Sequence, residues 1–163
     1  MSASLGAALN ACRRAALVWV LSLAMVATLG AGARAAETEP LVVETDSGSH
    51  AFDVELAVTP SERGRGLMYR QSMADDAGML FDFGVDDEAT MWMQNTYIPL
   101  DMIFITADGT VHRIARDTTP FSTEIISSKG PVRAVLELNA GKAAEIGLKR
   151  GDTVRHRMFG NDG

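Results

Sequence analysis

The chain has 163 residues, with 21 Asp and Glu against 15 Lys and Arg, and its formal net charge is -6. Removing the first 36 residues takes away three Arg and no acid, so the charge falls to -9. Nucleic acids and anionic membrane surfaces require Lys and Arg to neutralise phosphates, so the charge opposes binding to either, and we expect neither as a partner of the mature protein.

The first 36 residues have the layout of a secretory signal peptide. An Arg pair precedes an apolar run over residues 15–29, and residues 33–35 (Ala-Arg-Ala) form a small-x-small cleavage sequence. An uncleaved membrane anchor is the alternative, which the cleavage sequence and the glycines beside it disfavour. We therefore expect a periplasmic or secreted protein with a single domain over residues 37–163. The one cysteine, Cys12, lies in the leader, so this domain has no disulfide and no thiol chemistry.

The first elements of the mature chain are a predicted hairpin and a helix. Strands expected over residues 41–45 and 50–58 flank an Asp-Ser-Gly-Ser turn cluster. Residues 59–62 (Thr-Pro-Ser-Glu) form a capping box that begins a short helix ending near Tyr69. Two glycines at positions 64 and 66 weaken this helix, so we expect a close backbone approach there.

The rest of the chain is expected to be mostly strands. A long polar surface loop is expected over residues 116–131, and a second short helix over 142–146. The segment over 100–106 is apolar on both faces and is expected at the centre of a sheet. The spacing of short strands predicts an antiparallel sandwich or jelly-roll-like barrel with two short helices. The strands are expected over residues 78–83, 89–93, 100–106, 110–115, 132–138 and 153–159.

Five separated motifs cover nearly the whole chain after the leader. They are residues 62–70 (ERGRGLMYR), 77–81 (AGMLF), 92–96 (WMQNT), 98–103 (IPLDMI) and 136–141 (LELNAG), and Gly151-Asp152 follows them. Together these motifs resemble the bacterial family catalogued as domain of unknown function 192. The resemblance implies a compact, mostly β domain of sandwich or jelly-roll type that is often exported, and it implies no activity.

Two acidic side chains stand in apolar strands. Asp101 shares a strand face with Ile103, where a charged carboxylate is costly unless it is hydrogen-bonded, and Glu137 lies between two leucines. We expect Asp101 to be a structural carboxylate that accepts backbone N–H groups or an Arg. The enzymatic alternative is a carbohydrate-active hydrolase in which Asp101 and Glu137 open onto one cleft, roughly 5 to 10 Å apart.

The segment around Trp92 suggests a binding site. An exposed Trp92 beside Asn95 and Asp101 would form a stacking platform with polar groups at its rim, whereas the alternative is an ordinary core Trp. Our leading hypothesis is an exported, non-enzymatic binding or accessory module that recognises a small molecule, a glycan or a protein. Its candidate ligand-binding residues are Arg65, Arg70, Trp92, Asn95, Asp101 and Glu137.

Metal and nucleophile chemistry have weaker signals. Met91 and Met93 share a strand face, and thioethers bind Cu(I) in exported proteins, but such a site needs a third sulfur. The three His residues are scattered, and the sequence contains no phosphate loop, G-x-S-x-G elbow or His-carboxylate metal motif. We therefore expect no catalytic residue, no metal and no cofactor.

Overall fold

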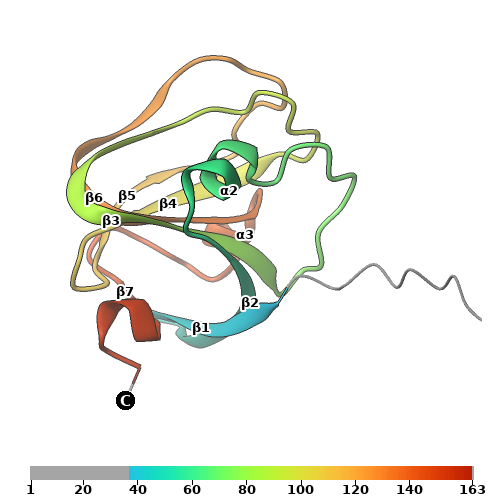
Figure 1. The fold of residues 1–163 in the computed structure, drawn as a ribbon. Helices are drawn as coiled ribbons and strands as arrows, with labels where there is room; N and C mark the ends of the chain where they lie inside the picture. Colours follow the sequence, from blue (N-terminus) through green and yellow to red (C-terminus); the bar gives the residue numbers. More distant parts are fainter. Residues whose placement is uncertain (1–36, 163) are drawn as a thin grey trace, which may run out of the picture. The chain divides into compact units, whose positions relative to one another are not determined.

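The computed structural model describes residues 37–162, which form a curled seven-stranded sheet with two short helices (Figure 1). The mainly β prediction is thereby confirmed. The expected signal peptide, residues 1–36, lies outside the described residues. The elements are β1 (Thr38–Thr45), β2 (Gly48–Ala57), α2 (Pro60–Arg65), β3 (Ala77–Met91), β4 (Leu100–Ile105), β5 (Val111–Ala115), β6 (Ile126–Asn139), α3 (Lys142–Glu145), β7 (Thr153–Arg155) and the 3-10 helix η1 (Arg157–Phe159).

The sheet has the strand order β5-β4-β6-β3-β2-β1-β7. Its neighbours are antiparallel except β2 and β3, which run parallel because the chain passes through α2 and a long loop between them. The two edge strands approach each other through an isolated bridge between Thr110 and Thr153. Beside it, the N–H of Val111 donates to the carbonyl of Asp152 at 2.8 Å. The sheet is therefore curled until its edges meet.

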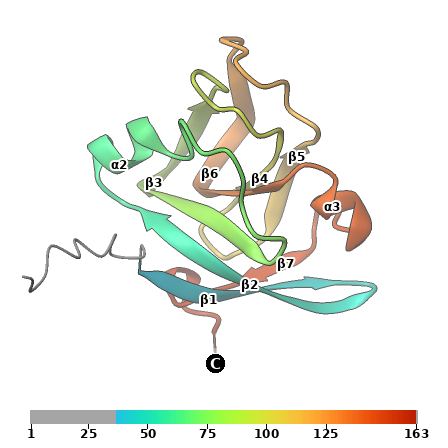
Figure 2. The ribbon, with the colours of Figure 1, turned by 90° about the vertical axis from the view of Figure 1, so that its right-hand side faces the viewer.

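Each face of the sheet carries a hydrophobic cluster. The inner cluster takes residues from all seven strands and from the segment around α3. The outer cluster lies mainly on β3, β4 and β6, and loop residues such as Leu67, Met93 and Ile98 cover it. Figure 2 shows α2 and α3 on opposite sides of the strands. The prediction of a central, doubly apolar strand is confirmed by β4, which is buried along its length between β5 and β6.

Helix α2 begins with the predicted capping box. The Thr59 hydroxyl accepts a hydrogen bond from the backbone N–H of Glu62 at 3.2 Å, and the Glu62 carboxylate accepts one from the N–H of Thr59 at 2.8 Å. These bonds satisfy donors that the first helical turn leaves free. Both helices in residues 37–162 are short, and none is long and apolar enough to cross a membrane.

The helix ends at Arg65, before its predicted end near Tyr69, because Gly66 leaves the helical conformation. Its φ of 47° and ψ of -135° lie in a region that side chains with a Cβ avoid. A Cβ on Gly66 would also meet the Phe81 ring at 3.0 Å. The expected close approach is therefore found at Gly66, whereas a Cβ on Gly64 would meet nothing within 4 Å.

The two glycines predict opposite effects of substitution. Gly64→Ala should raise the free energy of unfolding by about 0.5–1 kcal/mol, because Ala is the better helix former and has room. Gly66→Ala should lower it by about 2 kcal/mol, since it adds backbone strain and a tight contact with Phe81. Urea denaturation of both variants checks this, and effects of the same sign would contradict the assignment of Gly66 as the conformational requirement.

The two strands predicted over 78–83 and 89–93 are one long strand, β3. It pairs with β6 through two register shifts in the acidic stretch between Asp82 and Thr90. Correspondingly, β6 begins at Ile126, inside the predicted surface loop. The middle of β3 is exposed on both faces, so no alternation of apolar residues marks it as a strand.

Candidate functional site

A cavity of about 270 Å³ opens on the outer face of the sheet beside α2. Its walls are the end of α2 and the following turn, the β3 residues Phe81 and Met91, and the segment that carries Trp92 and Thr96. Glu137, from β6, also lines it. Apolar side chains make up most of this lining, as in pockets for small organic molecules. We call this cavity the Glu137 pocket.

The Glu137 carboxyl is buried and has no partner. Strand β6 places it between Met79 on β3 and Met102 on β4, so its immediate surroundings are apolar. Glu137 as a whole is 4% exposed, and within residues 37–162 no group donates a hydrogen bond to its carboxyl or forms an ion pair with it. Desolvation by burial raises the pKa of Glu137 to about 8. At neutral pH the group is mostly the uncharged acid, which can donate one hydrogen bond and accept others.

Trp92 and Arg65 present free surfaces to the same pocket. Trp92 is 46% exposed, so it is not the core residue of the alternative interpretation. Arg65 is exposed, and its guanidinium forms no hydrogen bond or ion pair with any residue of the described chain, 37–162. Its neighbour Arg63 is engaged, because its guanidinium donates to the carbonyls of Val58 and Asp82. Arg65 is therefore the cation that remains available to a ligand.

Asp101 is a structural carboxylate outside the pocket. Strand β4 pairs Met102 with Glu137, so Asp101, one residue earlier, points to the opposite face of the sheet from Glu137. It is fully buried, and its two oxygens accept the backbone N–H groups of Asp117 at 2.9 Å and Ala143 at 2.8 Å. The structural expectation for Asp101 holds. The hydrolase hypothesis is wrong, because the two carboxyls do not share a cleft.

Arg70 and Asn95 lie near the pocket but are engaged elsewhere. Arg70 forms a bidentate ion pair with Glu55, with Nη1–Oε1 and Nη2–Oε2 distances of 2.5 and 2.6 Å. It lines an adjoining hollow of about 630 Å³ rather than the Glu137 pocket. The Asn95 side-chain amide donates to the Met68 sulfur at 3.9 Å. The predicted residues that one pocket brings together are Arg65, Trp92 and Glu137.

An exposed aromatic cluster outside the lining of the Glu137 pocket was missed by the sequence analysis. Tyr69, Tyr97 and Phe121 are exposed and in ring contact, with centroid distances of 6.3 and 5.0 Å. Tyr69 and Phe121 have φ values of 66° and 62°, which bulky residues avoid. Backbone hydrogen bonds to the carbonyls of Asn95 and Thr96 hold both turns. Such strain is concentrated at functional sites. The only sign of this cluster in the sequence is that three segments without the alternating pattern of a strand each contain one of these aromatic residues.

The two methionines of the Cu(I) hypothesis are core residues. Met93 is fully buried, and its sulfur accepts a hydrogen bond from the Thr118 hydroxyl at 3.1 Å. Met91 lies in the same outer cluster. Met91 also lines the Glu137 pocket, so copper binding by the pair would require the Met93 sulfur to turn out of the core. Among residues 37–162, no group of three or more His, Cys, Asp or Glu could hold a metal ion.

The chain is similar to a known family and to solved structures. A model of the family DUF192, described as an uncharacterized ACR, matches residues 42–156. A Sinorhizobium meliloti 1021 protein, named as a candidate transcription regulator, is 50% identical; the match covers 74% of this chain and 95% of that one, with a TM-score of 0.73. A Novosphingobium aromaticivorans protein of unknown function is 42% identical, with 77% and 89% covered and a TM-score of 0.73. None of the curated proteins compared matches the chain.

Proposed function

The chain belongs to the DUF192 family, and we propose that it is an exported, non-enzymatic binding protein whose site is the Glu137 pocket. The observation that carries this proposal is the Glu137 carboxyl: the residue is nearly buried, the carboxyl lacks a protein partner within residues 37–162, and it faces an otherwise mostly apolar cavity. A buried polar group without a hydrogen bond destabilises the folded state. A ligand that completes those hydrogen bonds would offset this cost.

The chemistry of the pocket defines the class of ligand. A protonated carboxyl offers a donor and an acceptor side by side, which an amide group matches with its carbonyl and N–H. The cavity of about 270 Å³ has room for one small molecule or one group of a larger molecule. Trp92 supplies a flat apolar surface, and Arg65 can reach a polar substituent at the mouth. The proposed ligand is a small uncharged molecule or group with an apolar body and an amide-like head.

The set of ionisable residues supports binding over catalysis. General acid and base chemistry needs a second titrating group or a nucleophile beside the first. The charged residues that line the pocket with Glu137 are Arg63 and Arg65, and arginines keep their proton. The lining contains no His, Cys, Ser or Lys and no second carboxyl. A single carboxyl with a raised pKa suits recognition of an uncharged ligand.

Location and charge support an extracytoplasmic role. The signal-peptide layout of residues 1–36 favours the periplasm or the exterior of the cell. The regulatory role in the name of the Sinorhizobium meliloti protein is not part of the proposal, because the chain after residue 36 has a formal charge of -9. Within residues 37–162 of this chain, the longer α-helix, α2, has six residues, which is short for a helix that reads a major groove.

Binding of small amides at two pH values tests the proposal. Trp92 is the only Trp after residue 36, so its fluorescence reports on the pocket. An alkyl amide should change this fluorescence saturably at pH 6.5, and its affinity should fall by about tenfold at pH 9.5, where Glu137 ionises and loses its donor hydrogen. An alkylammonium ion of the same shape should bind more tightly at the higher pH.

Two variants at one position sharpen this test. Glu137→Gln should keep amide binding and lose its pH dependence, since Gln is an uncharged donor and acceptor. Glu137→Leu should abolish binding, whereas Glu124→Gln, on an exposed loop, should behave as the wild type. Equal amide affinity of the Glu137→Leu variant and the wild type would contradict the proposal.

A further inference from the structure

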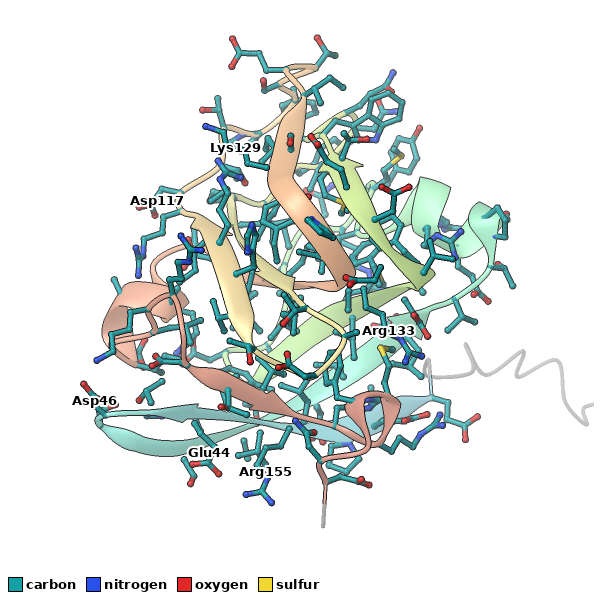
Figure 3. The ribbon with its side chains drawn as sticks, turned by 90° about the vertical axis from the view of Figure 1, so that its left-hand side faces the viewer. Glu44, Asp46, Asp117, Lys129, Arg133 and Arg155 are labelled. Carbon is teal, nitrogen blue, oxygen red and sulfur yellow. The ribbon has the colours of Figure 1, made fainter. Side chains whose placement is uncertain are left out.

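A second hollow, of about 470 Å³, has a strongly basic lining. Five of the twelve Lys and Arg residues after residue 36 line it, together with His112, and none of its lining residues is Asp or Glu. Figure 3 looks onto this face, with Lys129 near one end of β6 and the exposed Asp117 beside β5. We call this hollow the basic pocket. Its lining is His112, Arg113, Ile114, Arg116, Ser128, Lys129, Lys149 and Arg150.

Two arginines of the basic pocket are held in place by the fold. Arg113 donates from Nη1 to the carbonyl of Ser127 at 2.7 Å, and its guanidinium carbon lies 5.4 Å from the centroid of the Phe104 ring. Arg116 donates from Nη2 to the carbonyl of Leu148 at 2.5 Å. These bonds use part of each guanidinium, so further N–H groups remain for an oxyanion. Little side-chain entropy is then lost when an anion binds.

Two further cations of the basic pocket lack a counter-charge. Neither Lys129 nor Arg150 forms an ion pair with a residue of the described chain, 37–162, whereas Lys149 pairs with Asp46. Lys129 lies in β6 at the irregularity between the pairs Thr90–Ser127 and Glu88–Pro131; it has a φ of 57° and is followed by Gly130 with a φ of 150°. A Cβ on Gly130 would lie 2.9 Å from Nε2 of His112, so this irregularity favours glycine beside the ring. Strand β6 thus holds Lys129 beside His112.

We propose that the basic pocket binds the phosphate group of a phosphorylated ligand. Several cations and no lining carboxylate favour a doubly charged anion, and two guanidinium forks suit an acceptor with three oxygens. Three carboxylates lie next to its cations: Asp117 follows Arg116 in the chain, Asp46 is bound to Lys149, and the Asp152 carboxylate already accepts the backbone N–H of Lys149 at 2.9 Å. The proposal is independent of the Glu137 pocket, with which this lining shares no residue. The phosphate belongs either to a soluble phosphomonoester or to a lipid headgroup.

Titration with inorganic phosphate tests this site on the purified protein. Amide NMR signals of Lys129, Gly130 and Arg150 should shift saturably with phosphate when chloride holds the ionic strength constant. The double variant Lys129→Gln/Arg150→Gln should weaken binding at least tenfold, because it removes two charge-assisted contacts. Arg133→Gln is the matched control: it lies on β6 outside the lining, and its guanidinium pairs with Asp82 at 3.3 Å. It should leave the phosphate affinity unchanged.

The outcomes separate the two sources of phosphate. Binding to phosphatidylcholine vesicles that contain phosphatidic acid, lost in the double variant, would identify a lipid headgroup. Phosphate binding without vesicle binding would identify a soluble phosphomonoester, and either result supports the site. Shifts that fail to saturate, that chloride reproduces, or that the double variant retains in full would overturn the proposal.

Discussion

Raising the pH from 5 to 8.5 should lower the free energy of unfolding by about 4 kcal/mol through Glu137 alone. Its carboxyl has a pKa of about 8 in the folded protein against an ordinary value of 4.5. The unfolded chain therefore releases this proton first, and ionisation favours unfolding throughout the interval. The contribution is fully present below pH 4.5 and is lost as the pH rises through 8.

Comparison with Glu137→Gln isolates this effect from other titrating groups. Gln fills similar space and stays uncharged, so the variant should match the wild type near pH 5 and exceed its free energy of unfolding by about 4 kcal/mol at pH 8.5. Burial also lowers the pKa of His156, but both proteins share that contribution and it cancels in the difference. Urea denaturation of both proteins at several pH values measures this difference in the free energy of unfolding. Parallel pH profiles for the two proteins would show that Glu137 is ionised in the fold.

Asp101→Asn should lower the free energy of unfolding by about 3 kcal/mol at pH 7. Both carboxylate oxygens accept a backbone N–H, one from Asp117 in the loop after β5 and one from Ala143 in α3. Asn has one acceptor oxygen, so its NH₂ group would face one of these donors in a buried site. The substitution thus leaves two donors in contact without an acceptor.

The exposed neighbour supplies the control for this substitution. Asp117→Asn changes the same chemical group, but the Asp117 side chain is exposed and its backbone N–H is retained. Its φ of 50° is also one that Asn adopts readily. It should change stability by less than about 0.5 kcal/mol. Thermal and urea unfolding of both variants decide the matter, and similar small losses at the two positions would refute the structural role of Asp101.

The features that could be predicted from the sequence depend on short stretches of chain. The hairpin of β1 and β2, the capping box of α2 and the burial of β4 follow from neighbouring residues and their alternation. The face of Asp101 was likewise predicted correctly, because side chains alternate along a strand. Glu137 lies on β6, which pairs with the strand that carries Asp101. Once the register of this pairing is known, the same rule places the two carboxyls on opposite faces of the sheet.

The features that could not be predicted depend on contacts between distant segments. The parallel pairing of β2 with β3 is set by how the loop after α2 returns to the sheet, and no local signal marks it. The Glu137 pocket forms where β6 meets the turn after α2 and the segment around Trp92. Whether Trp92 was buried or exposed stayed open for the same reason. The positions of Tyr69 and Phe121 in the aromatic cluster depend on backbone hydrogen bonds between loops.

The bridge between Thr110 and Thr153 also determines when the domain can be completed. Strand β7 pairs with β1, more than a hundred residues earlier, and meets β5 at the other edge of the sheet. Unpaired edges are templates for association with other chains. A nascent chain that has not released Arg155 therefore keeps two such edges, and folding only after residues 37–155 are all available removes both at once. Loss of the last ten residues would convert a self-contained protein into one prone to aggregate.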